Sequence, residues 1–197
     1  MAGRRLIIVG LLAALGGAAR AEMHLGVLYF PFELTSAKET AFPNWYHALG
    51  GRFAWGPEAA IGIEATVTYA RFDAGVTFDE TYSHPSTRSQ LLALLAATSG
   101  WQLGPARLYA VYGGGVLREG YTFAAHAAVV KYYPAGVLGA GLCFRLGRHV
   151  HLGVEPRFIP VLGDRLLGYP MGGGREPAVE DGHGPLFGVG VAAGYVF

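Results

Sequence analysis

The sequence predicts an all-β fold: an eight-stranded antiparallel up-and-down transmembrane β-barrel. The 197-residue chain is poor in charge, with 52% hydrophobic and 15% charged residues, whereas soluble domains carry about 25% charged residues. Eight segments alternate apolar with small or polar residues, which is the pattern of a strand whose two faces meet different surroundings. The connections between these segments alternate between short and long, as in bacterial outer-membrane barrels.

Residues 1–21 are predicted to be a secretory signal peptide rather than part of the fold. Arg4 and Arg5 precede an apolar stretch over 6–19, and residues 19–21 (Ala-Arg-Ala) form a small-x-small cleavage site. A membrane anchor helix is the alternative, but it needs about 20 apolar residues and this stretch is shorter. We therefore expect residues 22–197 to form one barrel domain.

Without the signal peptide, which holds three of the 15 basic residues, 12 basic residues face 14 acidic ones. This balance gives no basic field for nucleic acid, so we expect no nucleic-acid partner. The single cysteine, Cys143, cannot form an internal disulfide, and we interpret it as a small buried side chain.

The first three predicted strands cover 24–34, 44–55 and 60–72, and the third has the clearest alternation. Its apolar face consists of Ile61, Ile63, Ala65, Val67 and Tyr69. Its small and polar face consists of Gly62, Glu64, Thr66, Thr68 and Ala70. A period of two with the charge on the small face predicts lipid outside and a lumen inside.

The fourth segment, 90–102, is less clear. Leu91, Ala93 and Leu95 fit a lipid-facing side, with Gln90 and Thr98 facing inward. The leucines at 91, 92, 94 and 95 also fit a helical turn. We favour a strand, because the alternation of short and long connections requires one here.

The last four predicted strands cover 107–118, 134–146, 150–160 and 185–197, and each again alternates. In the final segment the apolar face consists of Phe187, Val189, Val191, Ala193, Tyr195 and Phe197.

Short turns are predicted at 56–58, 103–106 and 147–149. The remaining links, 35–43, 73–89, 119–133 and 161–184, are longer and rich in Asp, Glu, His, Pro and Ser, which are typical of solvated loops.

Aromatic residues lie near the ends of the predicted strands, as the two interfacial girdles of a barrel require. We assign Trp45, Trp55, Tyr69 and Trp101 to these girdles.

Nearly all charges within the predicted strands fall on the glycine-rich face. They are Arg52, Glu64, Arg145, Glu155 and Arg157. A soluble lipocalin-like barrel would have the reverse arrangement, with an apolar interior and a charged outside. Because unpaired charges in a narrow interior are unfavourable, we predict that these five form a polar network in the lumen. Eight strands leave an interior just wide enough for side chains, so we exclude a general porin and keep a gated path for small solutes as an alternative.

Three stretches resemble the eight-stranded outer-membrane barrels related to the transmembrane domain of outer membrane protein A: 108-LYAVYGGGVLR-118, 139-GAGLCFRLGRHVHLGVEPRF-158 and 188-GVGVAAGYVF-197. In that family's best-known barrel an acid and a base in the lumen form a gating ion pair, but Cys143 and Gly153 stand at the matching positions here. The resemblance therefore does not imply the same gate.

The C-terminal aromatic pattern resembles the signal that the outer-membrane assembly machinery recognises, which implies that role for Tyr195 and Phe197. Because the chain ends at Phe197, we expect no appended periplasmic domain.

The sequence offers little for chemistry. His84, His126 and His183 lie in three different long links, and nothing in their spacing requires a metal. Lipid-A-modifying barrels of the deacylase type need a His-x-Ser pair, and the nearest match, at His126, lacks the serine. We therefore predict no catalytic residue, no metal and no cofactor.

Together these features predict a monomer in the bacterial outer membrane, in contact with outer-membrane lipid and lipopolysaccharide and inserted by the barrel-assembly machinery. We expect a structural and surface-interaction role in membrane integrity and loop-mediated contacts. The alternatives are a narrow channel for small or hydrophobic solutes, similar to the OmpW group, and a lipid-A-modifying enzyme.

Overall fold

The computed structural model describes residues 22–34, 45–56, 61–73, 82–83, 86–123, 126–163, 165–170, 176, 178–180 and 185–197. The predicted signal peptide, the link 35–43 and most of the turn at 56–58 lie outside these residues. Among the described residues, no helix is long and apolar enough to cross a membrane.

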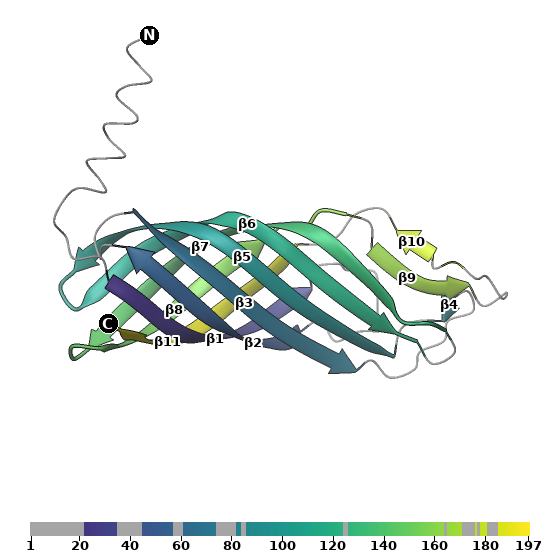
Figure 1. Ribbon diagram of the computed structural model, residues 1–197, viewed down its shortest axis with the longest axis horizontal. Coiled ribbons are helices and arrows are strands. Elements are labelled where there is room, and N and C mark those ends of the chain that lie inside the picture. The colour runs from purple at the N-terminus through teal and green to yellow at the C-terminus, as the bar shows by residue number, and fades with distance from the viewer. Residues whose placement is uncertain are drawn as a thin grey trace, which may run out of the picture.

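Eight antiparallel strands form a closed barrel, which confirms the predicted fold class (Figure 1). They are β1 (Glu22–Leu34), β2 (Trp45–Gly56), β3 (Ile61–Asp73), β5 (Thr87–Leu103), β6 (Ala106–Thr122), β7 (Val129–Leu146), β8 (Val150–Ile159) and β11 (Leu186–Val196). Their order around the barrel is β1-β11-β8-β7-β6-β5-β3-β2. The first and last strands close it, with Leu28 opposite Ala192.

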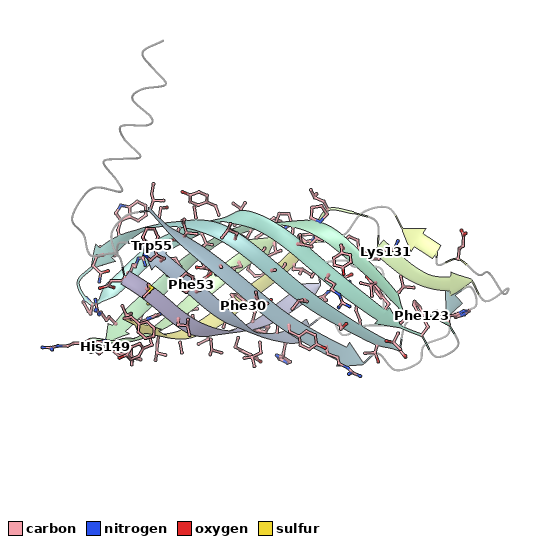
Figure 2. All side chains as sticks on the ribbon, viewed as in Figure 1. Phe30, Phe53, Trp55, Phe123, Lys131 and His149 are labelled. Atoms are coloured by element: carbon pink, nitrogen blue, oxygen red, sulfur yellow. The ribbon has the colours of Figure 1, made fainter. Side chains whose placement is uncertain are left out.

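The two faces of each strand differ as the sequence predicts. In β8, exposed and buried residues alternate from Val150 to Ile159. In β5, Leu91 and Leu95 are exposed whereas Leu92 and Leu94 are buried, so the segment that also fitted a helix is a strand. Side chains project outward along the whole barrel (Figure 2), and the outward positions are largely apolar. Every strand of the barrel carries exposed large apolar side chains, whereas soluble proteins rarely expose contiguous apolar patches larger than a few hundred Å².

Three neighbouring strands extend further than predicted. β5 and β6 each contain 17 residues and β7 contains 18, so most of the predicted link 119–133 and the end of the predicted link 73–89 are strand. This prediction was wrong because Arg88 and Glu119 were interpreted as solvated loop residues. Both point into the barrel, where they are 1% and 0% exposed.

The long links also contain strands that the sequence did not predict. β4 (Tyr82–Ser83), β9 (Arg165–Pro170) and β10 (Ala178–Glu180) form a three-stranded sheet in the order β10-β9-β4. This sheet lies at the barrel end opposite the C-terminus, which we call the loop end (Figure 1).

The other end, which we call the turn end, carries tight connections. Gly104 and Gly147 have φ angles of 62° and 73°, a left-handed conformation that favours glycine. They lie in the turns predicted at 103–106 and 147–149, and both turns are confirmed.

The strands approach one another closely at the glycine run 113–115. Gly115 lies opposite Leu94 of β5, and a Cβ atom added to Gly115 would overlap the backbone carbonyl oxygen of Ala93. Gly51 on β2 differs, because a Cβ there would meet no atom within 4 Å. Only the first position therefore requires glycine for packing.

We predict that Gly115→Ala destabilises the folded barrel by about 1–3 kcal/mol, since β5 and β6 must separate to admit the methyl group. Gly51→Ala is the matched control and should change the free energy of unfolding by less than about 0.5 kcal/mol. Urea unfolding in lipid vesicles measures both values. Equal stability of the two variants would contradict the close approach at Gly115.

Candidate functional site

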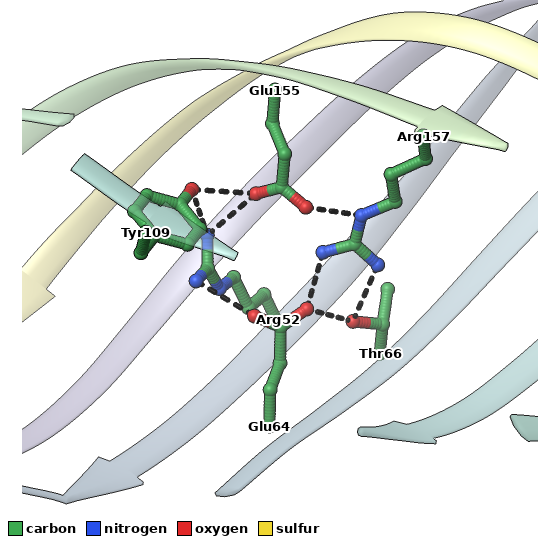
Figure 3. A network of polar contacts seen from close by, with 6 residues as sticks. All are labelled: Arg52, Glu64, Thr66, Tyr109, Glu155 and Arg157. Atoms are coloured by element: carbon green, nitrogen blue, oxygen red, sulfur yellow. Dashed lines mark hydrogen bonds and ion pairs between the residues drawn. The ribbon is translucent and has the colours of Figure 1, made fainter. Parts of the chain in front are cut away.

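A cluster of buried charges crosses the barrel lumen. It contains Arg52 on β2, Glu64 on β3, and Glu155 and Arg157 on β8 (Figure 3). Residues two apart on a strand share a face, so the inward face of β8 carries both Glu155 and Arg157. We call these four residues the charge ring.

Each guanidinium of the charge ring contacts both carboxylates. Arg52 lies 2.7 Å from Glu64 (Nη2 to Oε2) and 3.1 Å from Glu155 (Nη1 to Oε2). Arg157 bonds Glu155 through Nε and Glu64 through Nη2. Bases and acids therefore alternate around a closed circuit, and the four formal charges sum to zero.

Two neutral side chains complete the hydrogen bonding. The Tyr109 hydroxyl on β6 donates to Oε2 of Glu155 at 2.6 Å and accepts from Nη1 of Arg52 at 3.1 Å. The Thr66 hydroxyl donates to Oε1 of Glu64 at 2.8 Å. The ring of Phe30 packs 5.4 Å from the Arg157 guanidinium carbon, measured to the ring centroid. The charges are thus held by polar partners and by the apolar interior.

The charge ring is almost completely removed from solvent. Glu64, Glu155 and Arg157 are at most 1% exposed, and the Arg52 side chain is 10% exposed. Removing a charge from water costs several kcal/mol even after relaxation, and only close pairing with further hydrogen bonds offsets this. Each of the four charges contacts two groups of opposite charge, and both carboxylates also accept a hydrogen bond from a hydroxyl group.

The contacts join strands on opposite sides of the barrel. β3 and β8 are four places apart in the ring of eight strands, whichever way the ring is followed. The bond between Arg157 and Glu64 therefore crosses the lumen.

Cys143 and Gly153 match the gate positions of the resembled family. They are register partners on the neighbouring strands β7 and β8. Neither is charged, and the charges that meet across the lumen of this barrel come from other positions.

Arg145, the fifth residue assigned to the lumen network, does not join the charge ring. It lies near the turn end of β7, where Nη1 is 3.7 Å from Oε1 of Glu22 and Nη2 donates to the carbonyl of Arg148 at 2.9 Å. Its side chain is 33% exposed. The alternation predicts correctly that Arg145 lies on the inner face of the barrel. Because the strands are tilted, however, the residue lies at a different height along the barrel axis from the charge ring.

A second buried cluster escaped the sequence interpretation. Near the loop end, Arg88 donates to Oε1 of Glu119 at 2.5 Å, and Gln90 and Tyr121 also bond Glu119. All four residues are at most 3% exposed. The signal was the continued period of two: Arg88 lies two residues before Gln90, which was predicted to face inward, and Glu119 and Tyr121 lie beyond the predicted strand end at 118.

The aromatic residues assigned to the girdles are outward where their side chains are described. Trp55, Tyr69 and Trp101 are exposed on the outer face. Trp45 begins β2, but its side chain lies outside the described part of the chain.

The predicted assembly residues lie at the turn end. Tyr195 stacks on His149 with ring centroids 5.1 Å apart, and it meets the Phe197 ring edge-on at 4.9 Å. The Phe197 amide donates to the Met23 carbonyl at 3.1 Å, which ties the C-terminus to the first strand. Their role in assembly stays a prediction.

The described residues contain no group of three or more His, Cys, Asp or Glu side chains placed to hold a metal. His126 packs edge-on against Phe123, with ring centroids 6.3 Å apart. His84 and His183 lie outside the described residues.

Neither a protein-family model nor a curated protein matches the chain, but solved structures do. The attachment invasion locus protein Ail of Yersinia pestis matches at 11% identity with a TM-score of 0.53, covering 90% of this chain and 97% of its own. Neisserial surface protein A matches at 9% identity with a TM-score of 0.52 and the same coverages. OprG of Pseudomonas aeruginosa matches at 15% identity with a TM-score of 0.54, covering 90% and 95%. The chain therefore has the fold of small eight-stranded outer-membrane barrels.

We predict that Arg157→Met destabilises the barrel by about 3–5 kcal/mol, because it leaves two buried carboxylates with one guanidinium between them. Arg145→Met is the control on the same inner surface, and it should cost about 0–1 kcal/mol because that pair is long and partly solvated. Urea unfolding in lipid vesicles reports both values. A loss below about 1 kcal/mol for Arg157→Met would show that the charge ring does not hold the strands.

Proposed function

We propose that this chain is a small bacterial outer-membrane β-barrel protein with a structural and surface-interaction role and no catalytic activity. The apolar outer face supports a location in lipid, since only helices and closed barrels satisfy their backbone polar groups there. The fold shared with small outer-membrane barrels supports the same location.

The observation that carries the proposal is the closed lumen. The charge ring joins strands across the interior, and large apolar side chains fill much of the remaining space. Leu28, Phe30, Leu117, Ile159 and Leu186 are each at most 1% exposed. An eight-stranded barrel is just wide enough for such packing. A filled interior favours a protein that acts through its surfaces rather than through a pore.

The loop end supplies a surface for contacts. At about 3.3 Å per residue and a tilt of about 45°, the 18 residues of β7 rise about 42 Å along the barrel axis, whereas the hydrocarbon core is about 30 Å thick. β5, β6 and β7 therefore extend beyond the lipid on the loop side. Together with the sheet of β4, β9 and β10, they form a platform outside the membrane, where a partner can bind. The similar barrels include proteins named for attachment and for the cell surface.

A narrow gated channel is the second candidate. It is favoured by a cavity of about 40 Å³ at the turn end, which reaches Arg52 and Tyr109 beside the charge ring. The cavity therefore extends from the turn end into the lumen as far as the charge ring. A path would require Arg52 or Arg157 to leave its carboxylates, and the dense pairing opposes this.

We predict that the refolded protein stays electrically silent in planar lipid bilayers at all voltages tested, because the charge ring and apolar packing close the lumen. A general porin inserted into the same bilayers serves as the positive control. Discrete conductance steps that scale with protein concentration would overturn the structural role and support the channel.

Mass spectra of lipid A from cells with and without the protein should be identical, and a mass change would contradict the absence of catalysis.

A further inference from the structure

Three arginines and two histidines line the turn-end cavity. They are Arg52, Arg107, Arg145, His24 and His151. Among the described residues that form its walls, none carries a carboxylate. Glu64 and Glu155 bind Arg52, and the Glu22 carboxylate lies 3.7 Å from Arg145 and 3.8 Å from His24. Three guanidinium groups and no carboxylate therefore border the cavity itself within the described part of the chain.

The two histidines that line the cavity each have a ring nitrogen without a hydrogen-bond partner in the described structure. His151 is only 7% exposed, and its Nδ1 has no hydrogen-bond partner in the described structure. Nε2 of His24, whose side chain is 15% exposed, also has no hydrogen-bond partner there, and it lies 3.8 Å from Oε2 of Glu22. The two rings meet edge to face with centroids 5.2 Å apart. Buried polar atoms without partners are unfavourable by about 1–3 kcal/mol each, so a ligand that bonds them would be stabilised.

The arginines are held in place by the barrel wall. The Arg107 guanidinium carbon lies 5.6 Å from the centroid of the Tyr109 ring, and the Arg52 guanidinium carbon lies 5.2 Å from the same centroid. One tyrosine thus positions two guanidinium groups beside the same cavity. Planar guanidinium forks match the oxygen spacing of oxyanions, which is why arginine is so common in sulfate and phosphate sites.

The size of the cavity limits the ligand. Its volume of about 40 Å³ corresponds to roughly three water molecules, at 10–15 Å³ for each. This space suits one small polyatomic anion.

We propose that the turn-end cavity is a binding site for a small inorganic oxyanion of the sulfate or phosphate class. Arg107 and the imidazoles of His24 and His151 supply the donors, and Arg52 adds positive charge from the edge of the charge ring. The site depends on the interior geometry alone and does not require the lumen to conduct. In an outer-membrane barrel the short turns face the periplasm, so the anion would enter from that compartment.

Equilibrium dialysis of the full folded chain in nanodiscs of zwitterionic lipid against ³⁵S-sulfate tests this site. We expect saturable binding of one sulfate per chain, and displacement by inorganic phosphate but not by chloride at equal concentration. Arg107→Gln should weaken binding at least tenfold. Arg118→Gln is the matched control, because Arg118 lies on the same strand but alternates outward between the buried Leu117 and Glu119, and it should bind like the wild type.

Binding that does not saturate, or that is equal in Arg107→Gln and Arg118→Gln, would overturn the site. Displacement by chloride as effective as by phosphate would overturn the oxyanion class. If Arg107→Gln does not fold, as judged by its mobility on unheated gels, His151→Gln decides. A threefold or greater loss of affinity supports the site, and wild-type affinity contradicts it.

Discussion

The structure depends on one constraint: charges buried inside a narrow barrel must meet opposite charges there. Arg52, Glu64, Glu155 and Arg157 satisfy it together, since each base contacts both acids. Because successive side chains on a strand point to opposite faces, a slip of one residue in β3 or β8 would turn these charges toward the apolar outer face. We therefore regard the charge ring as a device that fixes register between strands far apart in the sequence. Its net contribution to stability can be small even so, because desolvation opposes the attraction.

The interior is layered along the barrel axis, and β5 displays the order. From the loop end, its inward side chains are the polar pair Arg88 and Gln90, then the apolar Leu92 and Leu94, and then Thr98 at the turn-end cavity. Polar clusters thus lie on both sides of an apolar middle. Buried apolar side chains thus fill the centre of the barrel, with a small cavity at the turn end and longer strands at the loop end.

The eight strands, their faces and the tight turns could be predicted because their signals are local. A period of two identifies a strand within about ten residues, and Gly104 and Gly147 mark turns where a left-handed conformation is needed. The level of a side chain along the axis is not local, because it depends on the tilt and stagger of the whole barrel. For this reason Arg145 was placed on the correct face but in the wrong cluster. Glu119 and Arg88 were missed for a related reason: a charged residue at a strand end resembles a loop residue until its partner across the sheet is known.

The most direct test of the charge ring is a double-mutant cycle between Arg52 and Glu155, which are 103 residues apart in the sequence and 3.1 Å apart in space. The free energy of unfolding in lipid vesicles is measured for the wild type, Arg52→Met, Glu155→Gln and the double variant. If the two charges bind each other, the sum of the stability losses of the two single variants should exceed the loss of the double variant by about 1–3 kcal/mol. Losses that add within about 0.5 kcal/mol would contradict a coupled charge ring and the closed lumen that follows from it.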